Sequence, residues 1–169
     1  SLVIAPDASS NDYEVHKELK ARGVDVLVID HHNAKKVSPD ACVINNQLSD
    51  YPNKQLSGVG VVYKFCCYLD EVLEVNYADE ILDLVALGMI ADMMDLREFE
   101  TKHLINLGLN KIRNPYFKGM IAHNQYFLKD GITPIGIAFS VAPAMNAVTR
   151  VGTPQEKVTL FESMLDFRG

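Results

Sequence analysis

The chain has 169 residues, of which 48% are hydrophobic and 22% are charged, and its formal net charge is -6 at pH 7. This composition allows one sizeable hydrophobic core and excludes disordered and collagen-like proteins. No apolar run approaches the roughly 18 residues of a membrane span, and the N-terminus lacks the pattern of a secretory signal, so we expect a cytoplasmic protein without a membrane partner. The acidic charge argues against a protein that binds nucleic acid over its whole surface, but it allows a local basic strip beside a metal centre.

Two apolar runs near the N-terminus, residues 2–5 and 24–29, predict buried strands. Between them, residues 11–14 have the pattern of a helix N-cap, and Gly23 has the pattern of a helix end. A strand, a helix and a second strand in this order predict a right-handed crossover in a parallel sheet covered on both faces. The turns after the two strands then fall at the same edge, where open α/β sheets bind ligands.

The second of these turns is Asp30-His31-His32, and it is the most informative segment of the chain. A carboxylate and two imidazoles at the end of a strand place oxygen and nitrogen donors together, as metal sites do. Taken alone, the segment can equally be a polar loop whose aspartate caps a helix. Asp7 also follows an apolar run, and so does Asp92, which ends the segment 84–91. Three carboxylates placed in this way favour a single metal site.

Further elements follow in the order of a sheet and then of helices. A strand is expected at 42–45, a polar loop at 47–56, and a helix from Gly58, where Gly58-x-Gly60 either cradles a phosphate or, as we favour, allows close helix packing. Helices are also expected at 77–91 and 97–112. We predict an α/β fold in which a parallel sheet is flanked by helices, with the metal-binding core at residues 1–114.

Residues 115–169 predict a mostly helical C-terminal part that leads into a connecting helix. Thr133-Pro134 and Thr153-Pro154 mark two helix starts, and the second belongs to a capping-box pattern with Glu156. The last helix is expected to run to Gly169, so that the chain has the character of an excised piece of a larger protein.

Five segments, in this order, resemble the DHH phosphoesterase family and, more narrowly, single-stranded-DNA-specific exonucleases of the RecJ type. The resemblance spans residues 2–152, and its segments are 5–7 (APD), 29–32 (IDHH), 51–60 (YPNKQLSGVG), 83–92 (DLVALGMIAD) and 142–152 (APAMNAVTRVG). It implies metal-dependent hydrolysis of single-stranded DNA from the 5′ end, in DNA repair or recombination. It also implies a site for two Mn²⁺ or Mg²⁺ ions in the full-length protein, and a single-stranded nucleic acid as the partner; protein partners stay unknown.

The resemblance also implies roles for individual residues. Asp7 would bridge two ions, and the metal ligands would be Asp7, His31 and Asp92. Asp30 would support this arrangement from beside it. His32 would face the scissile phosphate, and the nucleic-acid backbone would be contacted by Asn146 and Arg150.

The chain departs from the family pattern in three places. The family carries paired aspartates on an earlier strand, which no residue before Leu2 can supply, and it carries a smaller domain after this one. Thr149 stands before Arg150, where the family has glycine. We therefore expect this chain to bind one ion weakly and to hydrolyse little. Two alternatives stay open, namely a phosphodiesterase for short oligonucleotides or cyclic dinucleotides, and a non-catalytic scaffold that keeps the fold.

Overall fold

The computed structural model describes residues 1–165 and divides the chain into two compact units, which meet between Tyr77 and Ala78. Within the described part, no helix is long and apolar enough to cross a membrane. The sheet lies entirely in the first unit, and the second unit is helical. The division at residue 114, which was predicted from the order of the elements, stays a prediction.

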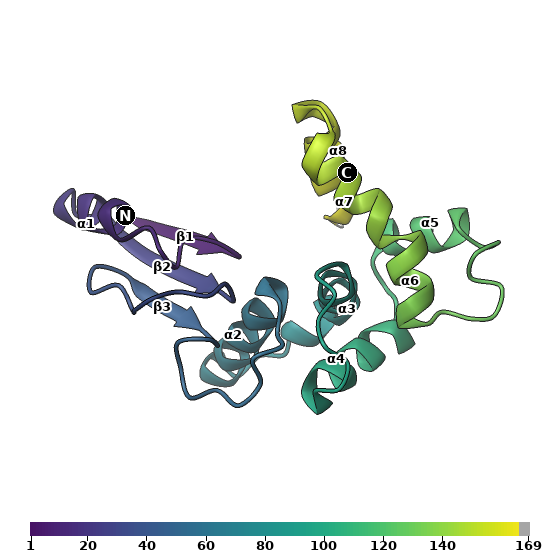
Figure 1. Ribbon diagram of the computed structural model, residues 1–169, viewed down its shortest axis with the longest axis horizontal. Coiled ribbons are helices and arrows are strands. Elements are labelled where there is room, and N and C mark those ends of the chain that lie inside the picture. Colours follow the sequence, from purple (N-terminus) through teal and green to yellow (C-terminus); the bar gives the residue numbers. More distant parts are fainter. Residues whose placement is uncertain (166–169) are drawn as a thin grey trace. The chain divides into compact units, whose positions relative to one another are not determined.

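A parallel sheet with helices forms the first unit, as the sequence predicts (Figure 1). The sheet has the strand order β1-β2-β3, and both pairs of strands are parallel. The elements are β1 (Leu2–Pro6), α1 (Tyr13–Ala21), β2 (Asp25–Asp30), β3 (Cys42–Asn45) and α2 (Gly58–Leu73). The fold class expected from the sequence is therefore confirmed.

The register of the strands brings their carboxyl ends together. Pro6 on β1 lies opposite Ile29 on β2, and Asp30 on β2 lies opposite Asn45 on β3. Beyond β1, the backbone N–H of Asp7 donates to the carbonyl oxygen of Ile29 at 2.8 Å, so the pairing continues into the turn. Residues that follow β1 and β2 are thereby fixed at one edge of the sheet.

Strand β1 is much more exposed than the sequence suggests. Leu2 is 60% exposed and Ile4 is 54% exposed, whereas Val28 on β2 is fully buried. The reason is that β1 is an edge strand, which among residues 1–165 pairs with β2 alone, while β2 is flanked on both sides. The prediction of a strand at residues 2–5 is therefore confirmed, whereas the prediction that this strand is buried is wrong.

The start of α1 also differs from the expected cap. Asp12 is the N-cap residue, but its side chain makes no capping hydrogen bond. Its carboxylate instead accepts a hydrogen bond from the Ser9 hydroxyl at 2.8 Å. The helix ends as expected, because Gly23 takes a positive φ of 71° that glycine adopts without steric cost.

The second unit consists of short helices and the segments that connect them. They are η1 (Ala78–Ile81), α3 (Leu82–Ala91), α4 (Phe99–Asn110), α5 (Pro115–His123), α6 (Pro134–Ser140), α7 (Ala142–Val151) and α8 (Pro154–Met164). Both predicted helix starts are confirmed, since Thr133 caps α6 and Thr153 forms a capping box with Glu156. Helix α8 ends at Met164, and residues 166–169, where the sequence predicts its continuation, lie outside the described residues.

Helices α3 and α4 pack closely because Gly108 has no side chain. A Cβ atom at Gly108 would lie 2.2 Å from the carbonyl oxygen of Leu82 and 2.6 Å from Cβ of Ala86. Asp83, which is 2% exposed, ties α3 to the segment after α4, because its carboxylate accepts the backbone N–H groups of Arg113 and Asn114 at 2.6 Å each. These contacts fix the first half of α3 against α4 and the segment that follows it.

We predict that Gly108→Ala lowers the free energy of unfolding by about 1–3 kcal/mol, because the added methyl group must displace backbone in a close-packed interface. Gly119→Ala is the matched control, since a Cβ atom there has nothing within 4 Å. This control should raise the stability by about 0.5–1 kcal/mol, because alanine loses less backbone entropy in a helix. Urea unfolding of both variants measures the difference, and equal stabilities would contradict the close approach.

Candidate metal centre

Asp7, His31 and His32 come together at the carboxyl edge of the sheet. One potential ligand atom from each residue lies within 4.8 Å of the other two. The shortest approach joins Nε2 of His31 to Oδ1 of Asp7 at 3.3 Å, and the two imidazole rings have centroids 4.5 Å apart. One carboxylate and two imidazoles thus face a common point, as the sequence predicts for Asp7 and His31.

The backbone at Asp7 is held in a conformation that non-glycine residues rarely adopt. Its φ is 56°, and Ser9, two residues later, has a φ of 80°. Aspartate tolerates this left-handed region better than most residues, and such strain gathers at functional sites. The strained turn starts directly after β1 and so places the Asp7 carboxylate beside His31.

Asp30 lies behind the cluster and organises both histidines. Its side chain is 1% exposed and accepts the backbone N–H groups of His31 at 2.8 Å and of His32 at 3.2 Å. The N–H of Ser10 donates to its other oxygen at 3.2 Å. Burial disfavours the ionised carboxyl, but these hydrogen bonds from Ser10, His32 and His31 outweigh burial and lower the pKa of Asp30 to about 2. Asp30 is therefore a charged, buried anchor rather than an exposed ligand.

The same carboxylate sets the tautomer of His32. Nδ1 of His32 lies 2.7 Å from Oδ1 of Asp30, a distance at which the ring N–H donates to the carboxylate. The other ring nitrogen, Nε2, then carries the lone pair in the neutral ring. His32, whose side chain is 59% exposed, can thus offer this nitrogen to a cation or, once protonated, to an anion.

The start of α2 closes the site from another side. A Cβ atom on Gly58 would lie 2.1 Å from Oδ1 of Asp7, so only glycine allows the helix to approach this carboxylate. The first turn of α2 contains no acidic residue, and a helix N-terminus favours nearby negative charge. Of the two interpretations of Gly58-x-Gly60, the close packing is the one seen at Gly58.

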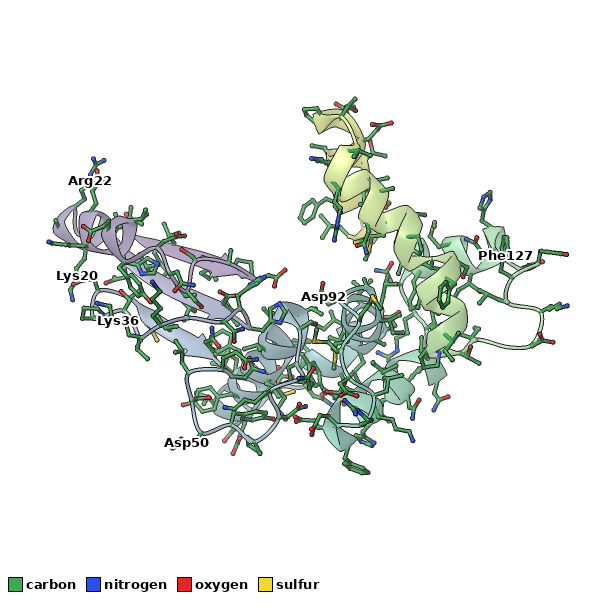
Figure 2. All side chains as sticks on the ribbon, in the orientation of Figure 1. Lys20, Arg22, Lys36, Asp50, Asp92 and Phe127 are labelled. Atoms are coloured by element: carbon green, nitrogen blue, oxygen red, sulfur yellow. The ribbon has the colours of Figure 1, made fainter. Side chains whose placement is uncertain are left out.

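Three of the predicted site residues belong to the second unit. Asp92 is the C-cap residue of α3, at the end of that helix in Figure 2. Nδ2 of Asn146 on α7 donates to the carbonyl oxygen of Ala91 at a long distance of 3.5 Å, so Asn146 lies next to the residue that precedes Asp92. Arg150 follows one turn later on the same helix. The grouping of these three residues with Asp7 and His31 stays a prediction.

The sequence reasoning missed two residues that support the site. Nδ2 of Asn45 donates to the Ser10 hydroxyl at 2.8 Å and to the carbonyl oxygen of His32 at 3.0 Å. Ser10 and Asn45 are both buried. The signal for Asn45 was its place at the end of the third strand, because a parallel register puts that residue beside Asp30.

Comparisons with known proteins decide the family. The model described as "DHH family, N-terminal domain" matches residues 1–89, which is more than half of the chain. The chain belongs to the DHH family. This confirms the resemblance that was read from the five segments between residues 5 and 152.

Within this family, the chain is similar to longer bacterial and phage proteins. It is 43% identical over 165 residues to the SPbeta prophage-derived protein YorK of Bacillus subtilis, covering 97% of this chain and 29% of that protein. It is 34% identical over 175 residues to the single-stranded-DNA-specific exonuclease RecJ of Bacillus subtilis, covering 96% and 21%. The chain thus spans less than a third of the length of these relatives.

Solved structures of RecJ share the fold. RecJ from Thermus thermophilus, solved in complex with Mn²⁺, matches with a TM-score of 0.82 and 27% identity over 98% of this chain and 25% of that one. Another structure, of exonuclease RecJ bound to manganese, matches with a TM-score of 0.76 and 26% identity over 94% of this chain and 40% of that one.

The variant Asp30→Asn tests whether the buried Asp30 carboxyl group is charged in the folded chain. Because the pKa of Asp30 is lowered from 3.8 to about 2 in the folded chain, its contribution to stability is present above pH 4 and is lost as the pH falls towards 2. The lowering of the pKa from 3.8 to about 2 corresponds to about 2.5 kcal/mol, of which about 2 kcal/mol is lost between pH 4 and pH 2. We predict that the unfolding free energy, measured by urea in EDTA, falls between pH 4 and pH 2 by about 2 kcal/mol more in the unmodified chain than in Asp30→Asn.

Asp25→Asn is the control for this change of net charge, because Asp25 is exposed at the other end of β2. If Asp30→Asn and the unmodified chain lose stability in parallel as the pH falls, Asp30 is not the charged anchor described above.

Proposed function

We propose that this protein is a divalent-cation-dependent exonuclease that digests single-stranded DNA from its 5′ end. The observation that carries the proposal is the convergence of Asp7, His31 and His32 within 4.8 Å, in a chain similar to proteins named single-stranded-DNA-specific exonuclease RecJ. The proposed cation is Mn²⁺ or Mg²⁺, in keeping with the manganese in the two RecJ structures.

The donor set fits such a cation. Carboxylate oxygen suits Mg²⁺ and Mn²⁺, and imidazole is accepted by several first-row metals. Two ligands about 2.1 Å from one ion lie roughly 3 Å apart. The 3.3 Å between Nε2 of His31 and Oδ1 of Asp7 is close to this separation. A bound cation would stabilise the charge that develops on a phosphate during hydrolysis.

Each site residue of the first unit then has its own role. Asp7 and His31 hold the cation, and the Asp30 carboxylate keeps His32 in one tautomer with its second nitrogen turned outward. His32 either completes the ligand set or binds a phosphate oxygen, and both tasks use the same ring nitrogen. The buried charge of Asp30 fixes the geometry before the substrate arrives.

We propose that the second unit adds a metal ligand and the residues that contact the DNA strand. Asp92 would complete the ligand set of one ion together with His31, and Asn146 and Arg150 would contact the phosphate backbone. Arg150 and Asn146 are four residues apart on α7 and therefore share one face of that helix. An arginine on this face can bind a phosphate with two parallel hydrogen bonds.

Hydrolysis of end-labelled DNA tests the function. In the full-length protein we expect manganese-dependent release of nucleotides from the 5′ end of a long single strand, and loss of at least about 100-fold in rate for Asp7→Asn or His31→Ala. Asp25→Asn, at the opposite end of β2, should keep the rate of the unmodified protein. Near-normal activity of either site variant would contradict the ligand assignment.

The choice of substrate separates the remaining alternatives. Faster hydrolysis of a dinucleotide or a cyclic dinucleotide than of a long strand would favour the short-oligonucleotide phosphodiesterase. Folded protein with neither activity nor manganese binding would favour the scaffold.

Arg150→Ala tests the proposed backbone contact. Each phosphate contact releases a counterion, so loss of one should weaken binding of single strands and reduce the slope of log affinity against log salt by about 0.7. Fluorescence anisotropy at several salt concentrations measures the slope. Arg22→Ala removes an equal charge from the end of α1 and should leave the slope unchanged. An unchanged slope in Arg150→Ala would contradict the contact.

A further inference from the structure

A second candidate binding site lies in the first unit, separate from the metal cluster. It is a cavity of about 370 Å³ between β3, the loop 46–56 and α2. Volumes of about 300–1,000 Å³ are typical of small-molecule sites, which combine an apolar lining with a few polar groups. The inner wall of this cavity has that character, because Leu56 and Val61 are buried apolar side chains.

One face of α2 supplies the rim of the cavity. Val61, Lys64, Phe65 and Tyr68 follow one another at the spacing that puts them on one side of a helix, and all of them line the cavity. Tyr68 is 61% exposed. Tyr51 lines the cavity from the loop. Aromatic side chains at a cavity mouth bind flat rings by stacking.

The loop that forms the other wall is held rigid by its own polar groups. Nζ of Lys54 donates to the carbonyl oxygens of Asn46 and Ser49 at 2.6 Å each, and Nε2 of Gln47 donates to the carbonyl oxygen of Lys54 at 2.8 Å. A loop cross-linked in this way loses little conformational entropy when a ligand binds. The cavity is therefore preformed.

Asn46 adds a polar group to this wall. Its side chain is 4% exposed, and its Nδ2 donates to the carbonyl oxygen of Asn53 at 3.1 Å. This bond joins two parts of the loop. Asn46 therefore helps to fix the shape of the cavity wall.

These features point to one ligand. We propose that the cavity binds a nucleobase, which stacks on Tyr68 and directs its phosphate towards Lys64. The inference rests on the proposed function, because it makes the base part of the same single-stranded substrate. All four DNA bases have an aromatic face, so such a site accepts any sequence, as an exonuclease without sequence preference requires.

The cavity also has a direct link to the metal cluster. Asn45, which lines the cavity, donates through Nδ2 to the carbonyl oxygen of His32 at 3.0 Å. A base in the cavity is thus separated from the candidate cation ligands by one residue of β3 and its hydrogen bond.

Nuclear magnetic resonance on this chain tests the inference in EDTA, where the metal centre plays no part. We expect dAMP to shift the backbone amide signals of Ser49, Tyr51 and Lys64, and to bind about tenfold more weakly to Tyr68→Ala, because stacking on one aromatic side chain has about this effect. Tyr77→Ala is the matched control, since Tyr77 is similarly exposed but does not line the cavity.

Two further ligands define the outcome. Deoxyribose 5-phosphate, which lacks the base, should bind several-fold more weakly than dAMP. N-acetyl-tryptophanamide should also bind more weakly, because an equal affinity would indicate a protein side chain as the occupant. Equal affinity of Tyr68→Ala and Tyr77→Ala for dAMP, or chemical shift changes only at residues outside the cavity, would overturn the inference. Neither result would contradict the proposed metal-dependent hydrolysis.

Discussion

The parallel pairing of β1 with β2 is the constraint on which the candidate metal centre depends. With Pro6 opposite Ile29, the turn after β1 and the turn after β2 begin at the same height in the sheet. A shift of the register by one residue would turn the side chains of β1 to the other face and separate Asp7 from His31. The hydrogen bond from the N–H of Asp7 to the carbonyl oxygen of Ile29 holds this register at its last position.

Asp30 links the backbone of the two turns to the positions of the candidate ligand side chains. Ionising a buried carboxylate costs free energy unless several hydrogen-bond donors surround it. Here the donors belong to the two turns that carry the candidate ligands. The N–H groups of Ser10, His31 and His32 all point to it. The two turns are therefore connected through one charge, and the ring of His32 takes its orientation from the same carboxylate.

Much of this organisation could be predicted from the sequence, and the exceptions have physical causes. The strands, their parallel order and the meeting of Asp7 with His31 follow from apolar runs and from the geometry of parallel sheets. The exposure of β1 could not be predicted, because burial depends on neighbours and not on the apolar character of the strand itself. The failure of Asp12 to cap α1 has a similar cause, since Ser9 competes for its carboxylate. The cavity beside α2 was missed because it depends on hydrogen bonds within a loop that has no periodic pattern.

Pulsed electron paramagnetic resonance of Mn²⁺ bound to the chain tests the central claim, that Asp7 and His31 hold one cation. Nitrogen nuclei of coordinated imidazole modulate the electron spin echo of Mn²⁺, so the spectrum reports the ligands themselves. We expect a nitrogen signal in the unmodified chain, its loss or reduction in His31→Ala, and its retention in His103→Ala, which removes a histidine of α4. A spectrum without nitrogen modulation, or one that His31→Ala leaves unchanged, would contradict the account.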